Sequence, residues 1–184
     1  MRGSYASHTA KAGFQRDSSL RKSVRDSFSA SPKDPSALQY SYRLLTYRGR
    51  SEKELRQRLK QKGFDEHDID SAIVSLTSNG FLDDRKLASA LRRYAEESKH
   101  YGIAGTRRFL KDRGIPADII DVTVNDMDET EVARKIIEKK MRSMVGDQPE
   151  KAARKLYGML YRRGYSSETI KTALEHFELR NDFS

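Results

Sequence analysis

The sequence predicts an all-α fold of three tandem three-helix repeats that form an elongated, curved array behind a flexible N-terminal tail. Two observations lead to this prediction. The pattern Leu-x-x-x-Gly, followed by an aromatic residue or isoleucine, occurs three times, and its glycines Gly63, Gly114 and Gly164 stand 51 and 50 positions apart. Apolar residues then recur at helical spacing, and strand signals are absent from the sequence. A register held three times indicates an internal repeat.

Each repeat glycine is expected to end one helix and to lead directly into the next. If Gly63 is the first residue beyond a helix, Leu59 and Phe64 occupy the two positions whose side chains meet in a Schellman turn. The glycine supplies the left-handed backbone that this turn needs. Asp65 is then a good N-cap for a following helix, as Ser166 is in the third copy. Each copy therefore contains three helices. A first helix is followed by a second helix, which ends at the glycine turn, and then by a third helix.

The copies are expected at residues 36–82, 83–126 and 127–184, after a tail over residues 1–35 that is rich in Ser, Lys and Arg. In the first copy, helices are predicted from about Ala37, from a capping box at Ser51–Glu54, and over Glu66–Ser78. The three-helix units are too small to be stable alone, so they are expected to pack side by side.

The second and third copies follow the same order. Asp83 and Asp84 are expected to cap and open the first helix of the second copy. The segment 101–105 is predicted to be a turn, with the second helix over 106–113. The third copy is predicted to open with an amphipathic helix around Ile136, followed by a linker over 146–149 and a helix that ends before Gly164.

Composition limits the function classes. The chain has 184 residues, a net charge of +9 and no cysteine. Disulfides and thiolate metal sites are thereby excluded, and an intracellular, cytoplasmic location is expected. No apolar run approaches the roughly 20 residues of a membrane span. The first 35 residues hold seven basic against three acidic side chains. A basic balance favours anionic partners such as nucleic acid, although a solvated surface explains it equally well.

An enzyme is not predicted, and neither a cofactor nor a metal is expected. The sequence has no GxxxxGK phosphate loop, and its four histidines are scattered. The acidic run 126–131 lacks the glycine and the glutamate of a calcium loop. Helix capping accounts for the neighbouring Asp83 and Asp84 without a catalytic cleft.

Cations on the second helix of each copy are the candidate binding residues. They are Arg56, Lys60, Arg107, Arg108, Lys111, Arg154, Arg162 and Arg163. A cation just before the repeat glycine is explained by the negative end of the helix dipole. That account does not cover Arg56, Arg107 or Arg108, which are expected near helix N-termini, where cations are unfavourable. These are interpreted as contacts to an anionic surface, with a solvated face as the alternative.

Three segments together resemble one family. They are 47–55 with its Ser-Glu-Lys-Glu-Leu, 80–88 with its Gly-Phe-Leu-Asp-Asp, and 162–165 with Arg-Arg-Gly-Tyr. In these segments, in 59–64, in 102–105 and in 110–115, the chain is similar to the RecX family of bacterial recombinase regulators over about residues 37–178. The resemblance implies three three-helix repeats. It also implies binding to the RecA–DNA filament, which would limit strand exchange and ATP hydrolysis in DNA repair and recombination, with no catalytic residue.

Two other functions stay open at this point. Three-helix units with a glycine turn also permit an independent DNA-binding protein of the tandem helix-turn-helix type that acts without RecA. A helical scaffold with no nucleic-acid partner is the third reading. A monomer that contacts single- or double-stranded DNA, directly or through the filament, is expected under the first hypothesis.

Overall fold

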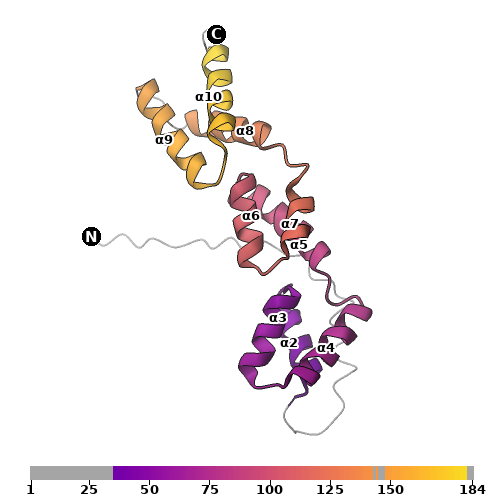
Figure 1. Ribbon diagram of the computed structural model, residues 1–184. Coiled ribbons are helices and arrows are strands. Elements are labelled where there is room, and N and C mark those ends of the chain that lie inside the picture. Colours follow the sequence, from indigo (N-terminus) through magenta and orange to yellow (C-terminus); the bar gives the residue numbers. More distant parts are fainter. Residues whose placement is uncertain (1–34, 143, 145–147, 182–184) are drawn as a thin grey trace, which may run out of the picture. The chain divides into compact units, whose positions relative to one another are not determined.

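The computed structural model describes residues 35–142, 144 and 148–181, and within these ranges it contains nine α-helices and no strand (Figure 1). The α-helices are α2 (Ala37–Tyr47), α3 (Glu52–Lys62), α4 (Glu66–Ser78), α5 (Asp84–Tyr94), α6 (Ile103–Asp112), α7 (Ala117–Val124), α8 (Glu129–Met141), α9 (Pro149–Arg162) and α10 (Ser167–Asn181). A π-helical segment, η1 (Ala95–Lys99), extends α5. The all-α prediction is confirmed. The copy boundaries and the elongated, curved shape stay predictions, and the predicted tail lies outside the described residues except for Pro35.

The described helices bury three separate apolar cores, one for each group of three. Helices α2–α4 enclose the first core, α5–α7 the second and α8–α10 the third. Fully buried leucines of the middle helix recur in each, namely Leu59, Leu110 and Leu160. Truncation of such a side chain to alanine costs about 2–5 kcal/mol, so each core stabilises its own copy strongly. No helix in the described ranges is long and apolar enough to cross a membrane.

The repeat glycines close Schellman turns in all three copies. Gly63, Gly114 and Gly164 have φ of 95°, 78° and 84°. In the first copy the Phe64 N–H donates to the Leu59 carbonyl at 3.2 Å, and the Gly63 N–H donates to the third-last helical carbonyl at 3.0 Å. The same pair of bonds forms at the other two glycines. The turn therefore follows from the local sequence alone, because its donors and acceptors lie within six residues.

The capping box predicted at Ser51 is only half formed. The Ser51 hydroxyl accepts from the Glu54 N–H at 3.1 Å, as predicted. The Glu54 carboxylate does not return to the Ser51 backbone, because it is bound by the guanidinium groups of Arg48 and Arg50. A complete capping box forms instead at the start of α2, between Ser36 and Gln39.

Neighbouring copies meet at two joints that use equivalent positions of the repeat. At the first joint the Ser51 hydroxyl donates to the Arg113 carbonyl at 2.8 Å, and the Glu52 N–H donates to the Asp84 carboxylate at 3.0 Å. The glycine turn of the second copy thus lies against the start of α3. The first residue of α5 supplies a capping carboxylate to that start.

At the second joint the partner atoms are mainly backbone. The Gly102 N–H donates to the Arg163 carbonyl at 3.0 Å, and the Ala104 N–H donates to the Gly164 carbonyl at 3.1 Å. The Glu129 carboxylate, at the first residue of α8, accepts from the Ile103 N–H at 2.8 Å. The third copy therefore caps α6 as the second copy caps α3.

This joint corrects the sequence prediction for residues 101–105. The sequence predicts a turn there before a helix over 106–113, yet α6 begins at Ile103, with Gly102 as its N-cap. Gly102 has no capping side chain, so a helix start here looked unfavourable from the sequence. The missing hydrogen-bond acceptors come instead from Glu129 and from the glycine turn at Arg163 and Gly164.

Tyr165 gives the third copy a predicted alkaline sensitivity. The side chain is buried, and among the described residues its hydroxyl has no hydrogen-bond partner. Burial, with a further contribution from the Glu129 charge, raises the pKa of Tyr165 from 10.0 to about 12. The unfolded chain therefore releases this proton first as pH rises. The free energy of unfolding should fall between pH 10 and 12, by about 2–3 kcal/mol when the transition is complete.

We expect Tyr165→Phe to remove this part of the pH dependence, because phenylalanine has no proton to lose. Urea unfolding at pH 8 and at pH 11 measures it in both proteins. The wild type should lose about 1 kcal/mol more than the variant over this interval. Equal losses would show that Tyr165 titrates alike in the folded and unfolded chains.

Candidate nucleic-acid interface

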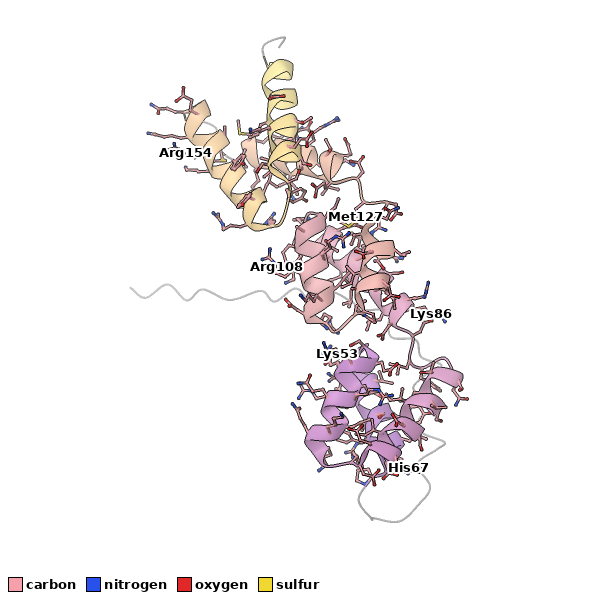
Figure 2. All side chains as sticks on the ribbon, in the orientation of Figure 1. Lys53, His67, Lys86, Arg108, Met127 and Arg154 are labelled. Carbon is pink, nitrogen blue, oxygen red and sulfur yellow. The ribbon has the colours of Figure 1, made fainter. Side chains whose placement is uncertain are left out.

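The eight predicted cations lie on three helices, one in each copy. Arg56 and Lys60 lie on α3, Arg107, Arg108 and Lys111 on α6, and Arg154, Arg162 and Arg163 on α9 or at its C-cap. All are exposed except Arg56 and Arg163, which are half-buried. The side chains of Arg108 and Arg154 project away from their helices (Figure 2). The structure does not gather the eight side chains into one pocket. They differ instead in whether a neighbouring carboxylate pairs with them.

Two of the arginines form equivalent ion pairs inside their own copies. Arg56 contacts Asp70 at 2.6 Å and Glu52 at 2.8 Å, while Arg107 contacts Asp121. The hydrogen bonds to Glu52 and then to Asp70 raise the pKa of Arg56. These carboxylates give both arginines a structural role that sequence reasoning missed. The signal was present, because arginine and aspartate both recur 51 positions apart.

The other cations differ in whether a carboxylate already neutralises their charge. Lys60 lies 2.5 Å from Glu66. Among the described residues no carboxylate forms an ion pair with the exposed cations Arg108, Lys111, Arg154 or Arg162. Arg163 contributes chiefly its carbonyl group, at the second joint. Among the eight candidates, the positive charge most available to a partner therefore lies at four positions on α6 and α9.

A cluster of arginines that was not predicted lies at the first joint. Arg48, Arg50 and Arg113 all approach the single carboxylate of Glu54, the last of them at 3.9 Å. Arg113 also donates from Nη2 to the Gly49 carbonyl at 2.8 Å. Its burial, followed by the neighbouring charge of Arg48, lowers its pKa. Three guanidinium groups on one carboxylate leave excess positive charge beside a pocket of about 220 Å³.

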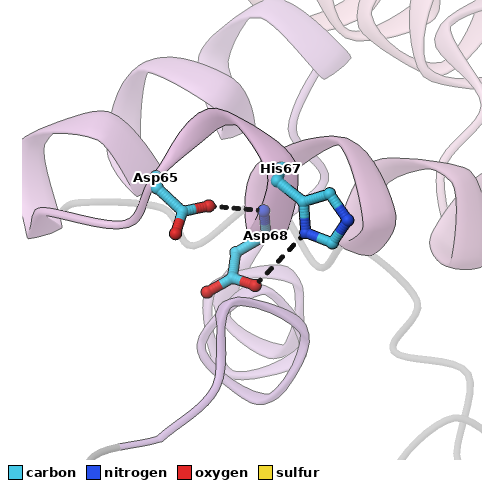
Figure 3. A group of neighbouring side chains, drawn as sticks. All are labelled: Asp65, His67 and Asp68. Carbon is cyan, nitrogen blue, oxygen red and sulfur yellow. Dashed lines mark hydrogen bonds and ion pairs between the residues drawn. The ribbon is translucent and has the colours of Figure 1, made fainter.

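One group of side chains at the start of α4 has the composition of a metal site. Ligand atoms of Asp65, His67 and Asp68 lie within 4.8 Å of one another, and all three residues are exposed (Figure 3). The Asp65 carboxylate accepts from the Asp68 N–H at 2.8 Å, and His67 Nδ1 lies 3.9 Å from the Asp68 carboxylate. Capping of α4 accounts for Asp65, and nothing else points to a bound ion.

Known proteins resemble this chain over most of its length. The model of the first three-helix domain of RecX matches residues 37–76, and that of the third matches residues 127–174. The regulatory protein RecX of Chlorobaculum tepidum is 36% identical over 143 residues, which cover 78% of this chain and 89% of the relative. The chain belongs to the RecX family. The regulatory protein RecX of Streptomyces coelicolor is 32% identical over 157 residues, covering 78% and 81% of the two chains.

Solved RecX structures share the fold. The crystal structure of RecX from Lactobacillus salivarius has a TM-score of 0.70 at 20% identity and covers 78% of this chain and 95% of that one. A second crystal structure of a regulatory protein RecX has a TM-score of 0.63 at 21% identity, covering 76% and 70%. These relatives are named as regulatory proteins.

Proposed function

We propose that this RecX-family protein binds the RecA–DNA filament and regulates it, mainly by inhibiting its recombinase and ATPase activities in DNA repair and recombination. It acts by binding and not by catalysis, needs no cofactor, and works as a monomer in the cytoplasm. Family membership is the observation that carries this proposal. Exposed cations in at least two copies support it, since positive side chains spread over several helices suit contact with a phosphate backbone better than the reading of bases.

The eight cations remain the candidate contact residues, in two groups. Arg108, Lys111, Arg154 and Arg162 are exposed and form no ion pair with a described carboxylate, so they can bind phosphate or acidic side chains directly. Arg56, Lys60 and Arg107 would first have to exchange a carboxylate partner. Arg163 is already engaged at the second joint through its backbone.

The test is the ATP hydrolysis rate of RecA on single-stranded DNA, titrated with this protein at fixed salt. Binding to bare DNA is measured alongside, because affinity for DNA depends steeply on salt. Inhibition at concentrations well below those that coat the DNA supports action on the filament. Inhibition only at saturation of the DNA would favour the independent DNA-binding protein.

We expect Arg108→Glu to weaken inhibition of RecA by about tenfold, because a charge-assisted hydrogen bond contributes about 1.5–3 kcal/mol. Lys135→Glu is the matched control. It makes the same change in charge on α8, at a side chain that is 72% exposed and, among the described residues, pairs only with Glu131. The helical content of both variants should equal that of the wild type. Equal inhibition by the two variants would contradict this placement of the interface.

A further inference from the structure

The third copy departs from the other two at two positions of its second helix. Seven residues before the repeat glycine, the first two copies have Arg56 and Arg107, and the third has Tyr157. Three residues before it, they have lysines, and the third has Tyr161. Two cations have thus been replaced by two aromatic rings on the same helix face.

The acidic partner of this face is replaced as well. Asp70 and Asp121 stand seven residues after their glycines and pair with Arg56 and Arg107. The residue at this position in the third copy is the exposed Lys171. The structural ion pair of the other copies is therefore absent here, and the carboxylate has become a cation. Loss of the ion pair does not by itself require that the acidic side chain be replaced by a basic one. This face of the third copy is therefore suited to a different contact.

The two tyrosines form an ordered, partly exposed stack. Their ring centroids are 6.2 Å apart and the ring planes differ by 11°. Tyr157 packs against the third core, and its hydroxyl donates to Ser167 Oγ at 2.9 Å, so its ring is held in place. Tyr161 is 61% exposed. The ring of Tyr157, held in place, thus packs against the ring of Tyr161, which is open to solvent.

Two arginines of α9 lie close to this stack. Arg154 lies one turn before Tyr157 and is exposed, and Arg162 follows Tyr161. The guanidinium of Arg162 lies over the bare backbone of Gly158, where an added Cβ would be 3.3 Å from Nη1. The neighbouring carboxylates, Glu150 and Glu168, form no ion pair with these cations within the described residues. We call the set Arg154, Tyr157, Tyr161 and Arg162 the tyrosine face.

We propose that the tyrosine face binds single-stranded nucleic acid, with a base stacked on Tyr161 and phosphates on Arg154 and Arg162. Exposed aromatic rings beside cations are the means by which proteins bind single strands without sequence preference. A duplex keeps the faces of its bases stacked on one another, so it would engage the cations and leave the ring unused. An acidic protein surface would likewise not require the ring.

This inference rests on the proposed function and deepens it, because it names single-stranded nucleic acid as the ligand that the third copy contacts. It can fail separately, since its test contains no RecA. If the protein binds bare single strands through Tyr161 and yet leaves RecA unaffected, the tyrosine face stands and the proposed function falls. If it inhibits RecA and Tyr161 does not affect binding to bare strands, the reverse holds.

The test is fluorescence anisotropy of a labelled thymidine oligonucleotide of about 20 nucleotides at fixed low salt, with Tyr161→Lys as the main variant. Lysine is the residue of the other copies, and it adds a positive charge. A purely electrostatic contact predicts tighter binding by this variant. Stacking predicts that binding weakens by about tenfold despite the added charge. Tyr161→Phe keeps the ring and should bind within about twofold of the wild type.

A second arm removes the base instead of the ring. An abasic oligonucleotide of the same length should bind the wild type about tenfold more weakly than the thymidine strand, and this difference should disappear in Tyr161→Lys. The double variant Tyr157→Arg with Lys171→Asp restores the ion pair of the other copies and should lose the preference for bases. Equal or tighter binding by Tyr161→Lys, or no effect of removing the bases, would overturn the inference.

Discussion

Gly164→Ala should destabilise the protein far more than the same substitution at Gly63. Both glycines have a left-handed backbone, so alanine costs about 1–2 kcal/mol at either position. A Cβ at Gly63 would meet nothing within 4 Å. A Cβ at Gly164 would lie 2.0 Å from the backbone nitrogen of Gly105 and 2.6 Å from its Cα. No side-chain rotation can relieve that clash, because the opposing atoms are backbone.

The second joint must therefore open in Gly164→Ala. Opening it breaks the bonds from Gly102 and Ala104 to the glycine turn. We expect a cost about 2–4 kcal/mol beyond that of Gly63→Ala, from the clash and from the donors left unpaired. Urea unfolding gives the difference in free energy. Hydrogen exchange at the Ala104 amide reports the joint itself and should accelerate only in Gly164→Ala.

Gly114 provides an intermediate member of this series. A Cβ there would lie 2.6 Å from the Ser51 hydroxyl, a side-chain atom that can rotate away. The cost should therefore rise from Gly63 through Gly114 to Gly164. Equal costs at all three positions would mean that these glycines serve only their own turns and that the joints contribute little.

The glycine turns could be predicted because every atom that forms them is close in sequence. Leu59, Gly63 and Phe64 carry the whole signal of the first turn, and the helix that follows was predicted with its observed bounds, Glu66–Ser78. Core packing also follows from local spacing, since the buried leucines recur with the repeat. In these elements local preference and tertiary structure agree.

The start of α6 could not be predicted, because the groups that cap it lie far away along the chain. Glu129 is 26 residues from Ile103, and Arg163 is 61 residues from Gly102. The incomplete capping box at Ser51 has a local cause instead, since Arg48 and Arg50, six and four residues before Glu54, compete for its carboxylate. Long-range partners therefore cap the start of α6, whereas neighbouring arginines displace the capping contact at the start of α3.

In the candidate interface, too, the sequence predicts the local features and not the contacts between helices. That the cations repeat was visible in the sequence, but which of them are neutralised depends on contacts between helices. Arg107 and Arg108 are neighbours in sequence, yet Arg107 contacts Asp121 across two helices, and Arg108 forms no ion pair with a described carboxylate. Helix position alone therefore ranked as equal two arginines that differ in available charge.

Glu129 links three segments of two copies through one carboxylate. One oxygen accepts from the Ile103 N–H at 2.8 Å. The other accepts from the Ser166 N–H at 3.2 Å and from Thr169 Oγ1 at 2.9 Å. Asp84 holds the same first position in its helix and caps α3 at the first joint, but among the described residues it accepts only from the Glu52 N–H there. Glu129 therefore ties the start of α6 to the segment before α10, a link that Asp84 does not make among the described residues.

We expect Glu129→Ala to lower the free energy of unfolding by about 2–4 kcal/mol. The substitution leaves the Ile103 and Ser166 N–H groups without their acceptor, and each hydrogen bond to a charged group contributes about 1.5–3 kcal/mol. Water can reach the more exposed Ser166 amide and offset part of this loss. Urea unfolding measures the cost, and hydrogen exchange at Ile103 and Ser166 shows whether both helix starts loosen together.

Glu131→Ala separates this role from a general effect of charge. Glu131 lies in the same first turn of α8, so its removal loses the same favourable interaction with the helix dipole, about 0.3–1 kcal/mol. Its side-chain partners are Arg134 at 3.1 Å and Lys135 at 3.5 Å, which are surface ion pairs and contribute about 0–1 kcal/mol. A large cost for Glu129→Ala with a small one for Glu131→Ala locates the effect in the joint. Similar costs would assign both to the helix dipole, and the second joint would then rest on its backbone hydrogen bonds alone.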